Sequence, residues 1–140
     1  MNAEKKLLCV FFSPETPNEA MLNCLLALYK RDFQAPLNRT VAEAVSVLVY
    51  KSENINPYAV SELLREKIPR DSFLPVLKYL HELYLIINRH HEFTCRNFPP
   101  GVPGSGLRYP LLLTRHIKRL TRYFTMRRRK ESLVNIKGKD

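Results

Sequence analysis

Basic residues cluster at the carboxyl-terminal end of this 140-residue chain. Residues 108–140 hold 11 Lys and Arg against 2 Asp and Glu, whereas residues 1–107 hold 12 against 11. Helical residues three and four apart share one face, and four cations follow that spacing: Arg115, Lys118, Arg119 and Arg122. A second run comes soon after: Arg127, Arg128, Arg129 and Lys130. Because guanidinium groups bind phosphate through paired hydrogen bonds, this segment predicts a polyanionic partner, foremost nucleic acid.

The basic segment could also act without nucleic acid, in one of two ways. A cationic helix can be a solvated face, or can complement the helix dipole, without any partner. A basic amphipathic helix can also lie on an anionic membrane, which requires that its apolar face be left exposed. We expect that face to pack on the domain instead, and no run approaches the roughly 18 apolar residues of a membrane span. No membrane partner is therefore expected.

Residues that could support catalysis or bind a metal form no recognisable motif. The chain has no Gly-rich phosphate loop, no G-x-S-x-G and no H-E-x-x-H. His90, His91 and Cys95 could ligate a metal, but adjacent residues of a strand point to opposite faces. No C-x-x-C pair completes a zinc site. We predict no enzymatic activity, no cofactor and no metal.

Length and composition predict one globular domain over residues 1–126, followed by a basic, flexible tail over residues 127–140. Apolar residues make up 45% of the chain, which is typical of a protein with a packed core. The three widely spaced cysteines predict buried free thiols rather than a disulfide framework. We expect a cytoplasmic protein associated with the nucleoid, or a nuclear one in a eukaryote.

Apolar residues at helical spacing predict five helices, over residues 16–31, 38–50, 56–68, 72–84 and 110–126. Within the second, residues 45–50 (VSVLVY) could also form a strand because of their β-branched content. The short run Leu7–Phe12 could be a strand or an anchoring segment, and residues 97–106 should form a loop. In the fourth helix we expect these residues to face inward: Phe73, Val76, Leu77, Leu80, Leu83 and Tyr84. In the last helix we expect the same of Leu111, Leu112, Ile117, Leu120, Tyr123 and Phe124. Helices near Met21–Tyr29 and Val41–Val49 are apolar enough to form a dimer interface.

A hairpin is predicted after the fourth helix. Leu85–Arg89 and Glu92–Cys95 read as two short strands on either side of His90-His91. The resulting order is a helix, a short connection, a second helix and a hairpin.

This order and its apolar spacing over residues 56–95 resemble the winged helix-turn-helix superfamily. The likeness rests on Val60, Leu63 and Leu64 in the first helix and on Phe73, Val76, Leu77, Leu80 and Leu83 in the second. The segment LHELYLI also resembles the family's pattern L-x-x-L-x-x-I, which extends from the recognition helix into the first strand of the wing. The chain departs from the family in lacking a glycine before Leu85 and in placing Pro75 inside the recognition helix. The expected fold is mainly α, with a winged helix-turn-helix core, additional N-terminal helices, a short β-hairpin wing and a basic C-terminal helix.

The resemblance implies that the helix from Ser72 enters the major groove of DNA. Its contact residues would be Arg70, Ser72, Lys78 and Tyr79. The wing would contribute Arg89, His90, His91 and Arg96, while the basic C-terminal helix would contact phosphates.

The function predicted from these features is sequence-specific binding of double-stranded DNA by a homodimer, as in a small transcriptional regulator of bacteria, phages or plasmids. The alternative is an adaptor, in which the winged fold binds another protein and the basic tail anchors it to nucleic acid or an anionic surface. RNA binding is a third interpretation, weakened because the stacking motif of single-strand binders is absent.

Overall fold

The structure is a computed structural model that describes residues 2–28, 30–89 and 105–137, with side chains omitted at 30, 105–111 and 134–137. Over these residues the protein is all-α, with no strand. The elements are α1 (Ala3–Phe12), α2 (Asn18–Ala27), the 3₁₀ turn η1 (Lys30–Asp32), α3 (Pro36–Tyr50), α4 (Pro57–Lys67), α5 (Arg70–Arg89) and α6 (Ser105–Lys137).

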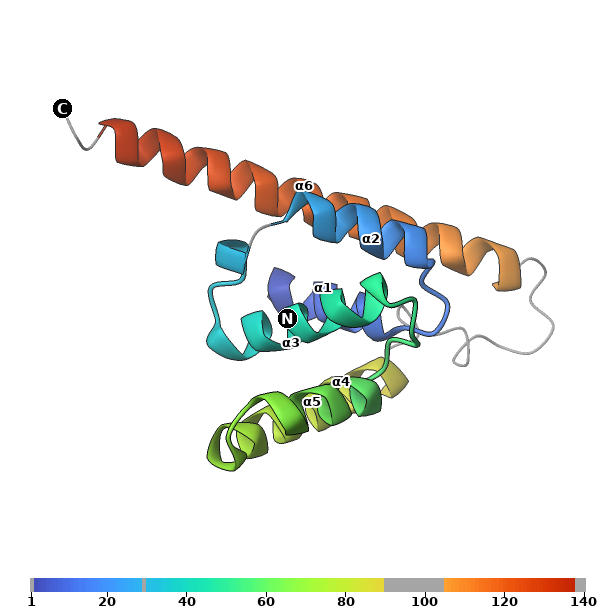
Figure 1. Ribbon diagram of the computed structural model, residues 1–140. Helices are drawn as coiled ribbons and strands as arrows, with labels where there is room; N and C mark the ends of the chain where they lie inside the picture. Colours follow the sequence, from blue (N-terminus) through green and yellow to red (C-terminus); the bar gives the residue numbers. More distant parts are fainter. Residues whose placement is uncertain (1, 29, 90–104, 138–140) are drawn as a thin grey trace.

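The helices form three layers (Figure 1). α2 and α6 lie together on one side, α1 and α3 occupy the middle, and α4 and α5 form the other side. α1 contacts α5 and α6, and α3 contacts α2, α4 and α5, so both middle helices join the two outer layers. α5 and α6 therefore lie on opposite sides of α1.

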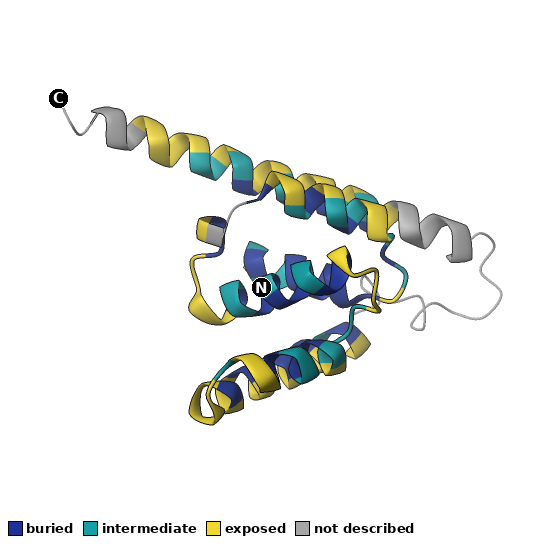
Figure 2. Ribbon diagram, in the orientation of Figure 1, coloured by how far each residue is buried: buried dark blue, intermediate teal, exposed yellow. Residues whose placement is uncertain are grey.

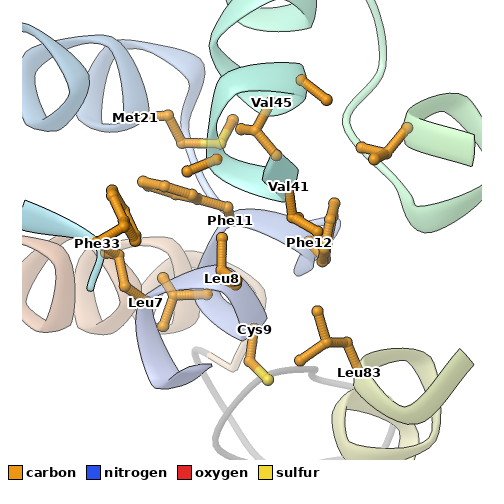
Figure 3. Close-up of a cluster of buried hydrophobic side chains, with 14 of the residues drawn as sticks. Leu7, Leu8, Cys9, Phe11, Phe12, Met21, Phe33, Val41, Val45 and Leu83 are labelled. Carbon is orange, nitrogen blue, oxygen red and sulfur yellow. The ribbon is translucent and has the colours of Figure 1, made fainter. Parts of the chain in front are cut away.

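The run Leu7–Phe12 is neither a strand nor an anchor, because it forms the second half of α1. All six of its residues are buried. A helix that is apolar on every side must be surrounded by other elements. Figure 3 shows how: Met21 of α2 and Val41 of α3 lie near Phe11, while Leu83 of α5 lies on the side of Cys9.

The predictions for α3 and α4 are confirmed. The apolar side of α3 lies in the core, including Val41, Val45 and Leu48. α4 begins where Asn56 and Pro57 predict, since Asn56 Oδ1 accepts a hydrogen bond of 2.8 Å from the Ala59 N–H. An N-cap of this kind satisfies one of the donors that a helix start leaves unpaired.

The first strand of the predicted wing is wrong, because Leu85–Arg89 forms the last turn of α5. Leu80, Leu83 and Ile87 are buried at helical spacing, so packing favours helix over the β-branched pair Ile86-Ile87. The second strand, Glu92–Cys95, lies outside the described residues. The mainly α part of the expected fold is thus confirmed, and no wing is observed in the described part of the chain.

Both long helices exceed their predicted bounds. α5 begins at Arg70 rather than after a Ser72 cap, and the Ser72 and Phe73 N–H groups both donate to the Pro69 carbonyl. α6 extends from Ser105 to Lys137 and continues without a break past residue 126, where the tail was expected to begin. The division into a domain and a flexible tail stays a prediction.

None of the helices over the described residues combines the length and the apolar character needed to cross a membrane.

Candidate nucleic-acid interface

One side of α6 is apolar and buried against the other helices. Leu113, Ile117 and Phe124 are buried completely or nearly so, and Leu120 is also buried. Phe124 meets Phe33 with ring centroids 5.8 Å apart, and the helix packs on α1 and α2. The apolar face formed by these four residues is therefore used for packing within the domain.

Among the described side chains of α6, those of residues 112–133, the opposite side carries six exposed cations, here called the basic face. They are Arg115, Lys118, Arg119, Arg122, Arg129 and Lys130. At 100° per residue they lie across the helix from Ile117 and Phe124, and at 1.5 Å per residue they extend over about 22 Å. None of the six takes part in an ion pair with another described residue. Figure 2 shows this exposed side along α6.

Two arginines of the second basic run are engaged inside the molecule. Arg128 lies 3.6 Å from Asp32 Oδ2 and donates a 3.1 Å hydrogen bond to the Ala27 carbonyl. Arg127 donates to the Asp32 carbonyl and lies over the Phe124 ring, 5.0 Å from its centroid. These two side chains fasten α6 to the end of α2 and to η1. The run of four basic residues thus divides into two structural and two exposed members.

A groove of about 580 Å³ lies between α2 and α6, along the edge of the basic face. Lys118 and Arg122 line it together with Glu19, and Cys24 and Thr121 contribute to its floor. The Thr121 hydroxyl lies 3.0 Å from Cys24 Sγ. Burial raises the pKa of the Cys24 thiol to about 11, partly opposed by the hydrogen bond with Thr121. The thiol is therefore protonated at neutral pH and is not a nucleophile.

Sequence reasoning missed that apolar side chains interrupt the basic face. Leu112 and Tyr123 were expected to face inward, but both are exposed. Met126 and Leu133 are exposed as well, in line with Arg115 and Arg122 along the helix. The spacing contained this information, because Leu113, Ile117, Leu120 and Phe124 are three or four residues apart and form a complete buried face without Leu112 and Tyr123.

The residues predicted on the recognition helix do not join this surface. Arg70, Ser72 and Lys78 are exposed on α5, on the far side of α1 from α6. Arg89, which was predicted on the wing, is exposed at the end of the same helix. Tyr79 points inward instead, and its hydroxyl donates to Asn38 Oδ1 on α3. Burial, reinforced by the nearby Cys9, Glu82 and Glu4, raises the pKa of the Tyr79 phenol far above its usual range.

Tyr79 belongs to a polar network that joins the middle layer to α5. Glu4 Oε1 accepts from the Asn38 side chain and from the Ala35 N–H, each at 3.3 Å. Lys5, one residue further along α1, pairs with Glu82 and lies 5.8 Å from the centre of the Tyr79 ring. Tyr79 is thus a structural residue of the core edge.

The wing residues His90, His91 and Arg96 lie outside the described residues. In the described part of the chain, no group of three His, Cys, Asp or Glu side chains is arranged to hold a metal ion. The candidate site therefore consists of the basic face of α6 and its groove.

Comparison with known proteins adds no relative. No protein-family model, no curated protein and no solved structure matches the chain.

Proposed function

We propose that the protein binds double-stranded DNA through the basic face of α6. The observation that carries the proposal is a row of six exposed cations without acidic partners among the described residues, fixed on a helix whose other side is buried. Fixed cations neutralise phosphates and release counterions, which supplies most of the sequence-independent affinity for DNA.

The dimensions of α6 support this proposal. The basic face extends over about 22 Å, a length comparable to six or seven phosphate steps of one strand at about 3.4 Å each. The major groove admits a single α-helix. The end of α6 projects beyond α2, and residues 129–133 are all exposed, so this end is not obstructed by the domain (Figure 2). Arg129 and Lys130 lie on this projecting part.

We further propose that the binding is sequence-specific and that the protein regulates transcription. The order of α4 and α5 agrees with the helix-turn-helix interpretation, but their connection, Ile68-Pro69, is shorter than the three to four residues that are typical of the motif. Base readout by α5 has less support, because the exposed charges on its outward surface have both signs, among them Asp71 and Glu82, whereas the charges of the basic face are all positive. We therefore assign base contacts, like phosphate contacts, to α6.

The first test is retention of a genomic fragment library at about 150 mM salt, followed by sequencing of the bound DNA. One enriched motif would support a sequence-specific regulator. Uniform retention with a steep salt dependence would support DNA binding without sequence preference. The proposal would be overturned if the protein retained no DNA, or if it bound anionic lipid vesicles as strongly as it binds DNA.

The second candidate is a protein-binding adaptor, and the exposed apolar side chains of α5 favour it. Affinity through such a surface barely changes with salt, whereas each phosphate contact lowers the slope of log K against log salt by about 0.9. The salt dependence of binding therefore separates the two functions.

A further inference from the structure

The outward face of α5 is apolar although it is exposed. Leu74 is 53%, Leu77 42% and Tyr84 51% exposed, and Leu85 is exposed too. His81 completes the face by stacking on Tyr84, with centroids 6.5 Å apart and planes 20° from parallel. At 100° per residue these five side chains fall within an arc of about 100°. They are called the apolar α5 face.

This face differs from the apolar surfaces that the sequence suggested for dimerisation. The apolar residues of α3, including Val41 and Val45, are buried in the core and are not available to a partner. Met21 and Cys24 of α2 are buried in the same way. On α5, by contrast, the buried side is complete without Leu77 and Tyr84, so these side chains remain at the surface.

A row of charges follows one edge of the apolar α5 face. It consists of four exposed residues: Asp71, Lys78, Glu82 and Arg89. Their signs are arranged so that reversing the order along the helix exchanges every sign. When two copies of α5 pack antiparallel, the same edge of each helix meets. Asp71 then lies opposite Arg89 of the second copy, and Lys78 lies opposite Glu82.

Both charge pairs have their midpoint at Leu80, and the apolar α5 face, from Leu74 to Leu85, is centred within one residue of it. A two-fold axis at this point would align apolar contacts and opposite charges together, as an isologous interface requires. Glu82 pairs with Lys5 through Oε1, and a carboxylate has a second oxygen with which to accept from Lys78 of the second copy. A different protein would have no reason to match this self-complementary order.

We propose that a second copy of this chain is the occupant, with α5 packed antiparallel on α5 about a two-fold axis near Leu80. The interface leaves α6 uncovered, since α6 lies on the other side of α1 (Figure 1). The inference is independent of DNA binding and stands or falls by the oligomeric state.

The experiment measures the mass of the full chain by light scattering and sedimentation over a range of concentrations. Wild type should approach twice 16.4 kDa. Leu74→Glu places a charge in the interface and should raise the dissociation constant on the order of 100-fold. The matched control is Leu26→Glu on α2, where the leucine is 62% exposed, and it should leave the dimer intact.

A charge exchange tests the antiparallel register and does not depend on the core. Asp71→Arg places the new arginine opposite Arg89 of the second copy at each end of the interface. This like-charge contact should raise the dissociation constant of the dimer roughly ten-fold. Arg89→Asp alone should do the same, and the double variant Asp71→Arg/Arg89→Asp should restore wild-type affinity. Circular dichroism checks that each variant is folded.

A monomer at every concentration would overturn the proposal. So would a dimer that Leu26→Glu breaks and Leu74→Glu does not, because the interface would then be elsewhere. A dimer whose double variant stays as weak as the single ones would overturn the antiparallel register. DNA affinity per protomer at low concentration should be the same for wild type and Leu74→Glu, so failure of the dimer is distinguishable from failure of DNA binding.

Discussion

α5 and α6 are the two longest helices, and both bury one side against α1, yet their outward sides differ in kind. α6 presents six exposed cations, whereas α5 presents leucines, a tyrosine and a row of charges of both signs. The inward pattern of a helix decides whether it folds onto the domain. The outward pattern decides its partner, and the two helices therefore point to partners of different chemistry on opposite sides of the molecule.

The same distinction applies within α6. Arg128 is only 17% exposed and pairs with Asp32, which is 4% exposed, while the adjacent Arg129 is exposed and has no ion pair with a described residue. A run of four basic residues in sequence is thus two kinds of residue in space. Only the exposed ones are expected to contribute to the salt dependence of DNA binding.

The largest effect is expected from the buried side of α6. Phe124→Ala removes a fully buried ring that contacts Phe33, and should lower the free energy of unfolding by about 3–5 kcal/mol. Urea denaturation measures this change. The control Met126→Ala, at an exposed position of the same helix, should stay within about 0.5 kcal/mol of wild type. Equal effects of the two variants would contradict the orientation of α6.

A second effect separates the outward sides of the two helices. Arg119→Ala/Arg122→Ala should reduce the salt slope of DNA binding by about 1.8 and weaken affinity roughly 30-fold at 150 mM salt, because two phosphate contacts are lost. Arg70→Ala/Lys78→Ala makes the same change of charge on α5 and should leave the slope unchanged. Fluorescence anisotropy with a labelled duplex measures both.

If the α5 variant instead had the larger effect, the helix-turn-helix mode of binding would be correct and the basic face would not be the DNA surface. Equal losses in both pairs would indicate that net charge alone, rather than a defined surface, governs binding.

A smaller effect tests the two kinds of arginine in α6. Arg128→Ala leaves the buried Asp32 carboxylate without its partner on α6 and should lower stability by about 1–2 kcal/mol. Arg129→Ala should leave stability within about 0.5 kcal/mol and lower the salt slope by about 0.9. Denaturation and anisotropy on the same two proteins give all four values. The reverse assignment of effects would show that Arg128 contacts DNA.

Much of the fold was predictable because helical spacing is a direct consequence of burial. α3 and α4 follow from Val41, Val45, Leu48 and the Asn56 cap. α1 could not be assigned, since six consecutive buried residues carry no period. Leu85–Arg89 was predicted as a strand because β-branched residues favour strands locally. In the structure this segment is part of α5, because Leu83 and Ile87 are buried against helices that are distant in the sequence.

The candidate site was predictable in part for a related reason. The spacing from Arg115 to Arg122 predicts a shared face, and the structure shows it. It does not reveal that Arg127 and Arg128 meet Asp32, because that contact joins residues 95 and more positions apart. Nor does the pattern of α5 reveal which leucines the neighbouring helices leave uncovered. Both depend on how the layers assemble.

The smallest effect concerns Tyr79, which the sequence placed on the DNA surface and the structure places against α3. Tyr79→Phe removes the hydroxyl that donates to Asn38 and should lower stability by about 1 kcal/mol. It should not change DNA affinity.

The pH dependence of stability gives a second measure of the same side chain. Because burial raises the pKa of the phenol, the stability contributed by its neutral form is fully present below the unfolded pKa, near 10, and is lost as pH rises above it. Urea denaturation of wild type between about pH 8 and 11 should therefore show a decline that Tyr79→Phe reduces. If Tyr79→Phe had unchanged stability and weaker DNA binding, Tyr79 would be a DNA-contacting residue, and α5 would be the recognition helix.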